Sequence, residues 1–174
     1  MAHGFCLVNL KFGFYFKQEV NFLMINGVKI KQLKAHCDER GRLMEMMRHD
    51  DPMFLKFGQV YMTTVYPGVV KAWHYHKKQL DSFVCVKGMI KLVLYDSRKG
   101  SKTKGEVNEF IMGEHNTIMV QIPNNVYHGF KGISEEEAII INTPTESYNA
   151  KVPDEFRLPA HTKKIPYDWK RKDR

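Results

Sequence analysis

Apolar and polar residues alternate in short runs along most of the chain, and this pattern predicts strands rather than helices. The runs are rich in β-branched and aromatic residues and are separated by turn-forming pairs such as Asn26-Gly27 and Lys99-Gly100. Helical periodicity is weak, and only residues 43–48 and 51–55 are expected to hold a helical turn or two. We expect strands at 28–33, 58–66, 69–76, 82–87, 90–96, 107–112, 117–122 and 138–142.

Many short strands at regular spacing, without an internal repeat or a low-complexity linker, predict an all-β fold. We expect an antiparallel double-sheet jelly roll, in which the inward faces of the two sheets fill or line a cavity. A chain of 174 residues is long enough to bury such a core in one domain. Residues 153–174 are rich in proline and charge, and they are expected to form an irregular C-terminal wrap that can include a short helix.

The first 23 residues are expected to be an N-terminal extension or an edge strand, with residues 24–174 as the single domain. Lys11, Lys17 and Glu19 interrupt the continuous apolar run that a signal peptide needs. No other stretch reaches the length required to span a membrane. We therefore expect a cytoplasmic protein without a membrane partner.

Cysteine use and charge narrow the function classes. Cys6, Cys37 and Cys85 lie far apart and form no CxxC pair, so neither a disulfide framework nor a zinc knuckle is predicted. The net charge of +8 suits either nucleic acid or an anionic small molecule. Because the chain has no dense basic helix and no RNA-binding aromatic signature, we expect a phosphate-bearing metabolite and no nucleic acid.

Three histidines and one carboxylate stand out. His74 and His76 are one residue apart on a predicted strand, so their side chains share a face of the sheet. Asp81 follows five residues after His76, and His128 comes after a turn that begins at Pro123. This spacing resembles the paired motifs of the cupin superfamily. The resemblance implies a cupin-type jelly roll that holds three imidazoles and a carboxylate in one small barrel.

Further motifs between Asp38 and Trp169 together resemble the dTDP-4-dehydrorhamnose 3,5-epimerase family. They include Arg40-Gly41-x3-Glu45, Lys71-Ala72-Trp73-His74 and Ile122-Pro123-x4-His128-Gly129-Phe130. The resemblance implies inversion of C3 and C5 of a 4-keto-6-deoxy hexose linked to dTDP, in the synthesis of deoxysugars such as rhamnose for a surface polysaccharide. It also implies a homodimer that needs no cofactor.

The resemblance assigns roles to individual residues. Inversion next to a ketone needs a base on one ring face, a proton donor on the other, and positive charge near the enolate oxygen. His74 matches the general base of the family, and His128 matches a residue that faces the keto group. Lys71 is expected to polarise the ketone together with His128. The nucleotide sugar is expected to be held by Arg40, Glu45, Gln59, Asn142 and Glu155.

The chain departs from the family at several of these positions. Asp81 stands where the family carries a lysine near the enolate oxygen, and Asn142 stands where it carries the proton-donating tyrosine. The aspartate that partners the base histidine has no clear counterpart. The donor therefore stays open among Tyr61, Tyr75, Tyr127 and Tyr148.

Two other functions remain open. His74, His76, Asp81 and His128 form a candidate cage for a divalent transition metal, because imidazole and carboxylate ligands suit iron, manganese, nickel or zinc. That hypothesis makes the protein a metal-dependent cupin enzyme with a small anionic substrate. The other alternative is a non-catalytic cupin that binds a sugar nucleotide.

Overall fold

The computed structural model describes residues 23–173, so the prediction for residues 1–22 lies outside the described part of the chain. Within 23–173 the protein is all-β and contains no helix, which confirms the predicted fold class. One five-stranded sheet has the order β1 (Lys29–Gln32), β9 (Ile118–Ile122), β6 (Asp81–Lys87), β11 (Ala138–Asn142) and β4 (Tyr61–Val65). The other has the order β12 (Phe156–Arg157), β5 (Val70–Tyr75), β10 (Val126–Gly132), β7 (Met89–Asp96) and β8 (Val107–Gly113).

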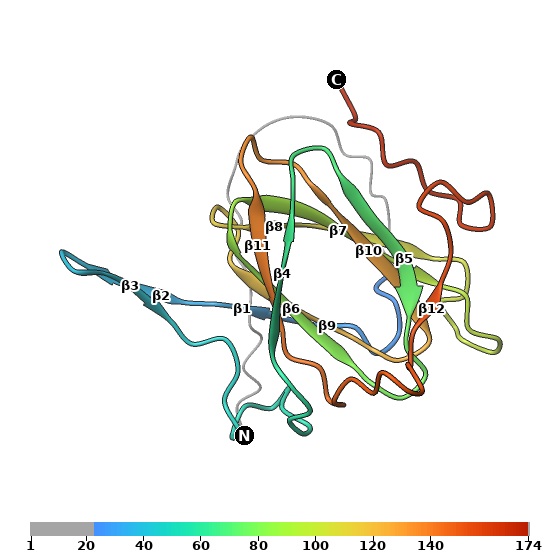
Figure 1. Cartoon of the computed structure of the whole chain (residues 1–174), viewed down its shortest axis with the longest axis horizontal. Coiled ribbons are helices and arrows are strands. Elements are labelled where there is room, and N and C mark those ends of the chain that lie inside the picture. The colour runs from blue at the N-terminus through green and yellow to red at the C-terminus, as the bar shows by residue number, and fades with distance from the viewer. Residues whose placement is uncertain (1–22, 174) are drawn as a thin grey trace, which may run out of the picture.

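The two sheets face each other as a jelly-roll sandwich, and a two-stranded hairpin projects away from it (Figure 1). The hairpin consists of β2 (Ala35–Asp38) and β3 (Gly41–Met44), and most of its residues are exposed. Within 23–173 no helix is long and apolar enough to cross a membrane.

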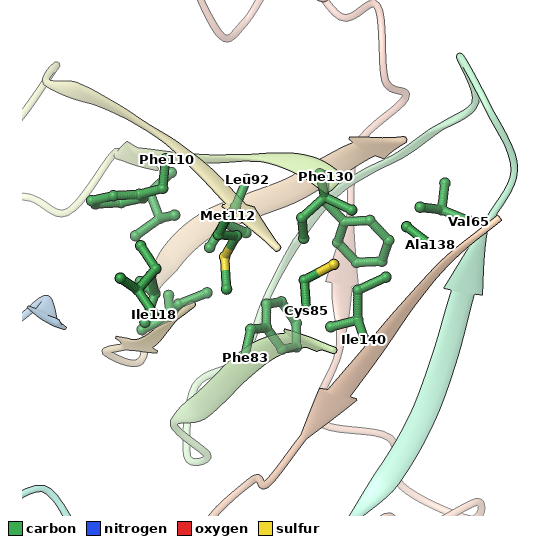
Figure 2. Close-up of a cluster of buried hydrophobic side chains, with 14 of the residues drawn as sticks. Val65, Phe83, Cys85, Leu92, Phe110, Met112, Ile118, Phe130, Ala138 and Ile140 are labelled. Carbon is green, nitrogen blue, oxygen red and sulfur yellow. The ribbon is translucent and has the colours of Figure 1, made fainter. Parts of the chain in front are cut away.

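The core lies between the inward faces of the sheets. Alternate residues of each strand point inward, so Phe83 and Cys85 on β6 meet Leu92 on β7 and Phe130 on β10 (Figure 2). These side chains are almost completely buried. Each fully buried Leu or Phe side chain stabilises the fold by about 1.5–3 kcal/mol. Phe83 and Phe130 of this core also line a pocket, so the apolar core borders the polar side chains of the site.

The C-terminal segment covers the outer face of the second sheet. Trp73 points outward from β5, opposite in phase to the histidines, and its ring centroid lies 4.9 Å from that of Trp169. Ile165 and Val93 complete this outer cluster, which is buried. The wrap is irregular apart from β12, and it holds no helix up to residue 173. The predicted C-terminal wrap is therefore confirmed.

The predicted helical turns at 43–48 and 51–55 are wrong. Residues 43 and 44 belong to β3, and the chain to residue 53 is extended or in tight turns. Its methionines are used to cover the outer face of the first sheet, where Met46 and Met53 pack against Val84 and Met119. Burial against an existing sheet thus outweighs a weak helical preference.

Strand β10 was not predicted as a strand, although it lies at the centre of the second sheet. The turn-forming residues at 123–125 and the glycines at 129 and 132 make this segment resemble a loop in the sequence. Its neighbours supply the reason that it is extended. It pairs with β5 on one side and with β7 on the other, so its backbone groups are satisfied by the sheet. The short strands β2, β3 and β12 were also missed.

Candidate active site

The register of the second sheet brings His74 and His128 together. Strands β5 and β10 are antiparallel neighbours, and His128 is the direct cross-strand partner of His74. The ring centroids of the two residues lie 4.1 Å apart. His76 follows β5 immediately, and its ring centroid lies 5.3 Å from that of His74 and 5.8 Å from that of His128. The three imidazoles therefore form one cluster.

Gly129 explains how the two strands can approach each other at this point. A Cβ atom at residue 129 would lie 2.2 Å from Cβ of Ala72, which is far inside contact distance. The pairing of β10 with β5 also changes register between His128 and Phe130. A glycine next to His128 is thus required by the packing of this strand pair.

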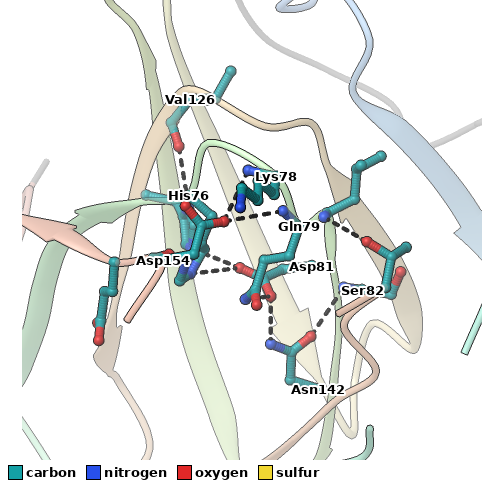
Figure 3. A network of polar contacts seen from close by, with 12 residues as sticks. His76, Lys78, Gln79, Asp81, Ser82, Val126, Asn142 and Asp154 are labelled. Atoms are coloured by element: carbon teal, nitrogen blue, oxygen red, sulfur yellow. Dashed lines mark hydrogen bonds and ion pairs between the residues drawn. The ribbon is translucent and has the colours of Figure 1, made fainter. Parts of the chain in front are cut away.

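Asp81 links the histidines to the opposite sheet (Figure 3). It is the first residue of β6, and its side chain is almost completely buried. Its Oδ1 accepts hydrogen bonds from Gln79 Nε2 at 2.9 Å and from Asn142 Nδ2 at 2.8 Å. Its Oδ2 lies 3.1 Å from His128 Nε2 and 3.3 Å from His76 Nε2. The Asp81 carboxylate therefore accepts hydrogen bonds from two side-chain amides and contacts two imidazoles.

Both of these imidazoles have their other nitrogen occupied. Nδ1 of His128 lies 3.0 Å from the carbonyl oxygen of Val126, and Nδ1 of His76 pairs with the carbonyl oxygen of Asp154. A carbonyl can only accept, so each Nδ1 carries a proton and each Nε2 is the atom that faces Asp81. These contacts with backbone carbonyls thus fix the orientations of both rings.

Neighbouring groups shift the pKa values of the ionisable side chains in this cluster. Burial acts against ionisation of Asp81, but the adjacent His128 and His76 hold the pKa of its carboxyl well below its usual range. Burial likewise opposes protonation of His76, yet the Asp81 carboxylate raises the pKa of that imidazole. His74 behaves differently. Burial and the adjacent His128 hold its pKa well below that of a free imidazole, so its ring is neutral near pH 7.

His74 lines a cavity at the open end of the sandwich. One lobe has a volume of about 520 Å³, and an adjoining lobe has a volume of about 470 Å³. Tyr61, His74 and Glu155 line both lobes, so the two lobes adjoin at these residues. Ligand pockets in proteins have volumes of about 300–1,000 Å³, so each lobe is large enough to hold a hexose.

The predicted site residues divide into three groups by position. Gln59 and Glu155 line the larger lobe, and Lys71 lines the smaller one. His128 and Asn142 are buried behind the cavity wall and line neither lobe. Arg40 and Glu45 lie outside both lobes, at the tip of the projecting hairpin and just after its second strand.

The polar network contains two residues that the sequence did not single out. Asp154 of the C-terminal segment accepts hydrogen bonds from the backbone N–H groups of residues 77, 78 and 79, at 3.0, 2.8 and 3.2 Å. Gln79 donates to Asp81. A run of backbone N–H groups after a strand end is a signal that some acceptor is needed, but the sequence does not tell which carboxylate supplies it.

Known proteins resemble this chain in both sequence and fold. The sequence profile described as dTDP-4-dehydrorhamnose 3,5-epimerase matches residues 22–174. The chain belongs to this family. The resemblance read from the sequence motifs is thereby confirmed.

Relatives from bacteria and archaea show the same affiliation. A spore coat polysaccharide biosynthesis protein of Bacillus subtilis is 44% identical over 146 residues, which is 84% of this chain and 97% of the relative. A probable low-salt glycan biosynthesis epimerase of Haloferax volcanii is 44% identical over 147 residues, which is 83% of this chain and 94% of the relative. The crystal structure of a dTDP sugar isomerase from Desulfovibrio desulfuricans G20 superposes with a TM-score of 0.80 at 30% identity, covering 83% of this chain and 92% of that one.

Proposed function

We propose that this protein is a nucleotide-sugar epimerase or isomerase that acts on a dTDP-linked 4-keto-6-deoxy hexose. One observation carries the proposal. In a chain of the 3,5-epimerase family, a neutral histidine, His74, lines a cavity of about 520 Å³ and is positioned by a second histidine. The relatives named for spore coat polysaccharide and glycan biosynthesis support a place in deoxysugar synthesis for a polysaccharide.

The chemistry requires a neutral base next to the ketone. C3 and C5 of the sugar flank the C4 ketone, so removal of either proton gives an enolate. His74 accepts that proton because its ring is uncharged near pH 7. A low pKa also makes His74 a weak base. Positive charge near the enolate oxygen must therefore lower the barrier further.

Lys71 is the residue that supplies this charge in our proposal. It lies on β5 three residues before His74 and lines the same cavity system. His128 was also predicted to polarise the ketone, and this role stays a prediction. Its burial behind His74 supports a positioning role, in which His128 and Asp81 fix the base against the sheet.

The remaining predictions keep their status as proposals. Gln59 and Glu155 lie where they can hold the nucleotide sugar, because both line the larger lobe. Binding of the nucleotide sugar by Arg40, Glu45 and Asn142 also remains a proposal. The homodimer and the cytoplasmic location are predictions of the same kind.

The direct test is incubation with dTDP-4-keto-6-deoxyglucose in deuterated water. We expect the protein to incorporate deuterium at C3, at C5 or at both, as followed by NMR. The variant His74→Asn should lose about 10²–10⁴-fold of this exchange rate, the usual contribution of a general base. A natively folded wild-type protein that leaves both carbons unlabelled would overturn the proposal.

A metal-dependent enzyme is the second candidate, and the ligand geometry favours it. Four side-chain atoms of His74, His76, Asp81 and His128 lie within 4.8 Å of one another. Nε2 of His128 lies 3.1 Å from Asp81 Oδ2 without making a hydrogen bond of ordinary geometry, and its Nδ1 donates to a carbonyl, as is usual for metal-bound imidazole. The residues therefore fit a divalent transition ion.

Elemental analysis of the purified protein separates the two candidates. The metal hypothesis predicts one equivalent of a transition metal, which is lost in the variant His76→Ala. If the purified protein contains no transition metal but still exchanges substrate protons with solvent, the epimerase proposal stands and the metal hypothesis is wrong. If dTDP raises the melting temperature but no exchange occurs, the third alternative holds, and the protein only binds the nucleotide.

A further inference from the structure

Inversion of a carbon needs a proton donor on the face opposite to the base, and the structure points to one tyrosine. We propose that Tyr61 is the catalytic acid that returns a proton to the enolate. This inference rests on the proposed epimerase function. Tyr61 on β4 is the direct cross-strand partner of Asn142 on β11.

The hydrogen bonds of Asn142 fix how the Tyr61 phenol is used. Oδ1 of Asn142 accepts from the backbone N–H of Ser82 at 2.9 Å, which determines the orientation of the amide. Its Nδ2 then donates to Asp81 Oδ1 at 2.8 Å and to the Tyr61 hydroxyl oxygen at 2.9 Å. The phenol oxygen is thus an acceptor in this contact, and its own proton is free to be donated to a ligand in the cavity.

Tyr61 and His74 approach the cavity from different sheets. Tyr61 is the first residue of β4, at the edge of the first sheet, whereas His74 lies on β5 of the second sheet. Both side chains line both lobes of the cavity. A sugar ring seated between the sheets therefore meets His74 on one face and Tyr61 on the other. That is the arrangement that inversion requires.

The charge state of Tyr61 agrees with a donor. Burial, assisted by the nearby Asp81 carboxylate, raises the pKa of Tyr61 to about 12. The phenol is therefore protonated near pH 7 and can give up a proton to a strongly basic enolate.

The other candidate tyrosines are less suitably placed. Tyr75 and Tyr127 pack against each other with ring centroids 4.7 Å apart, and Phe156 stacks on Tyr75. Neither lines the cavity. Tyr148 does line the larger lobe, but it is 63% exposed and no neighbour among the described residues fixes its hydroxyl. Tyr66, which is 67% exposed and lines neither lobe, is a suitable control position.

The step is a simple transfer of protons. The C–H bond breaks as His74 takes the proton, and its electron pair forms the enolate. The Tyr61 O–H bond then breaks as its proton forms a new C–H bond on the opposite face, and the enolate returns to the ketone. His74 and Tyr61 exchange their protons with water, so nothing else is consumed.

The test compares inversion with solvent exchange in deuterated water, using dTDP-4-keto-6-deoxyglucose. In Tyr61→Phe, we expect inversion to fall at least about 100-fold. Exchange should remain within about tenfold of the wild-type rate, because His74 still removes the proton and can return a deuteron on its own face. Tyr66→Phe should invert at the wild-type rate, because Tyr66 lies outside both lobes. The affinity for dTDP, measured by calorimetry, should be unchanged in both variants.

Three results distinguish a failure of the proposed function from a failure of the role of Tyr61. A wild-type protein without exchange overturns the proposed function itself. If the wild-type protein inverts its substrate and Tyr61→Phe inverts it within about tenfold of that rate, only the role of Tyr61 is wrong. Equal loss of exchange and inversion in Tyr61→Phe also overturns this role, since it would show that Tyr61 supports proton removal. If the phenylalanine variant does not fold, Tyr61→Leu is held to the same criteria.

Discussion

At the scale of single residues, Asp81 organises the site. One of its oxygens accepts from two amides, and the other faces two imidazoles whose orientations are fixed by backbone carbonyls. By the resemblance of the sequence motifs, Asp81 stands where a lysine is expected. A carboxylate there reverses the local charge and converts two neighbouring histidines into its partners, which is why the sequence alone suggested a metal cage as readily as a catalytic network.

Substituting Asp81→Asn should make stability less dependent on pH. The pKa of His76 is raised in the folded state, so its pairing with Asp81 stabilises the fold fully below about pH 6.5 and is lost as the pH rises through the folded-state pKa. Asp81 itself stays ionised throughout this range because its pKa is lowered. The variant should therefore lose more free energy of unfolding near pH 6 than near pH 8.5, as measured by urea denaturation. An equal loss at both pH values would contradict the pairing.

At the scale of elements, strand β10 and the C-terminal segment pack on β5 and position its residues. Strand β10 places His128 opposite His74, and the segment after β12 seals the outer face of β5. The alternating strands of the core were predictable because side chains of one kind share a face. Strand β10 was not, because Gly129 and Gly132 satisfy packing constraints from Ala72 and from the Tyr66 carbonyl, which are distant in sequence.

Removing the aromatic anchor of the C-terminal segment should destabilise the protein strongly. Trp169 is 1% exposed and packs against Trp73 and Tyr167, with ring centroids 4.9 and 5.0 Å away. Trp169→Ala should lower the free energy of unfolding by about 3–5 kcal/mol, because it leaves a cavity beside Trp73. The control Val152→Ala, at a 72% exposed position, should change it by less than about 0.5 kcal/mol. Chemical denaturation measures both, and similar values for the two variants would show that the anchor is unimportant.

At the scale of the whole molecule, the apolar core between the sheets borders a buried polar cluster around Asp81. The sequence sufficed for the fold class, for the histidine motif and for the C-terminal wrap, because these depend on local alternation and spacing. It did not show that Asn142 is enclosed and that Tyr61 reaches the cavity in its place, because that depends on which strands are neighbours. Nor did it show that Asp154 caps the turn after His76 from a distant segment.

The C-terminal segment that carries Trp169 also contributes Asp154 and Glu155 to the wall of the cavity. Stability on the outside of the second sheet and the shape of the ligand pocket inside are therefore properties of one continuous piece of chain. Proteolytic clipping or a bulky fusion near the C-terminus would therefore loosen the pocket wall and uncover the outer face of the second sheet together, so ligand binding and the fold would weaken in parallel.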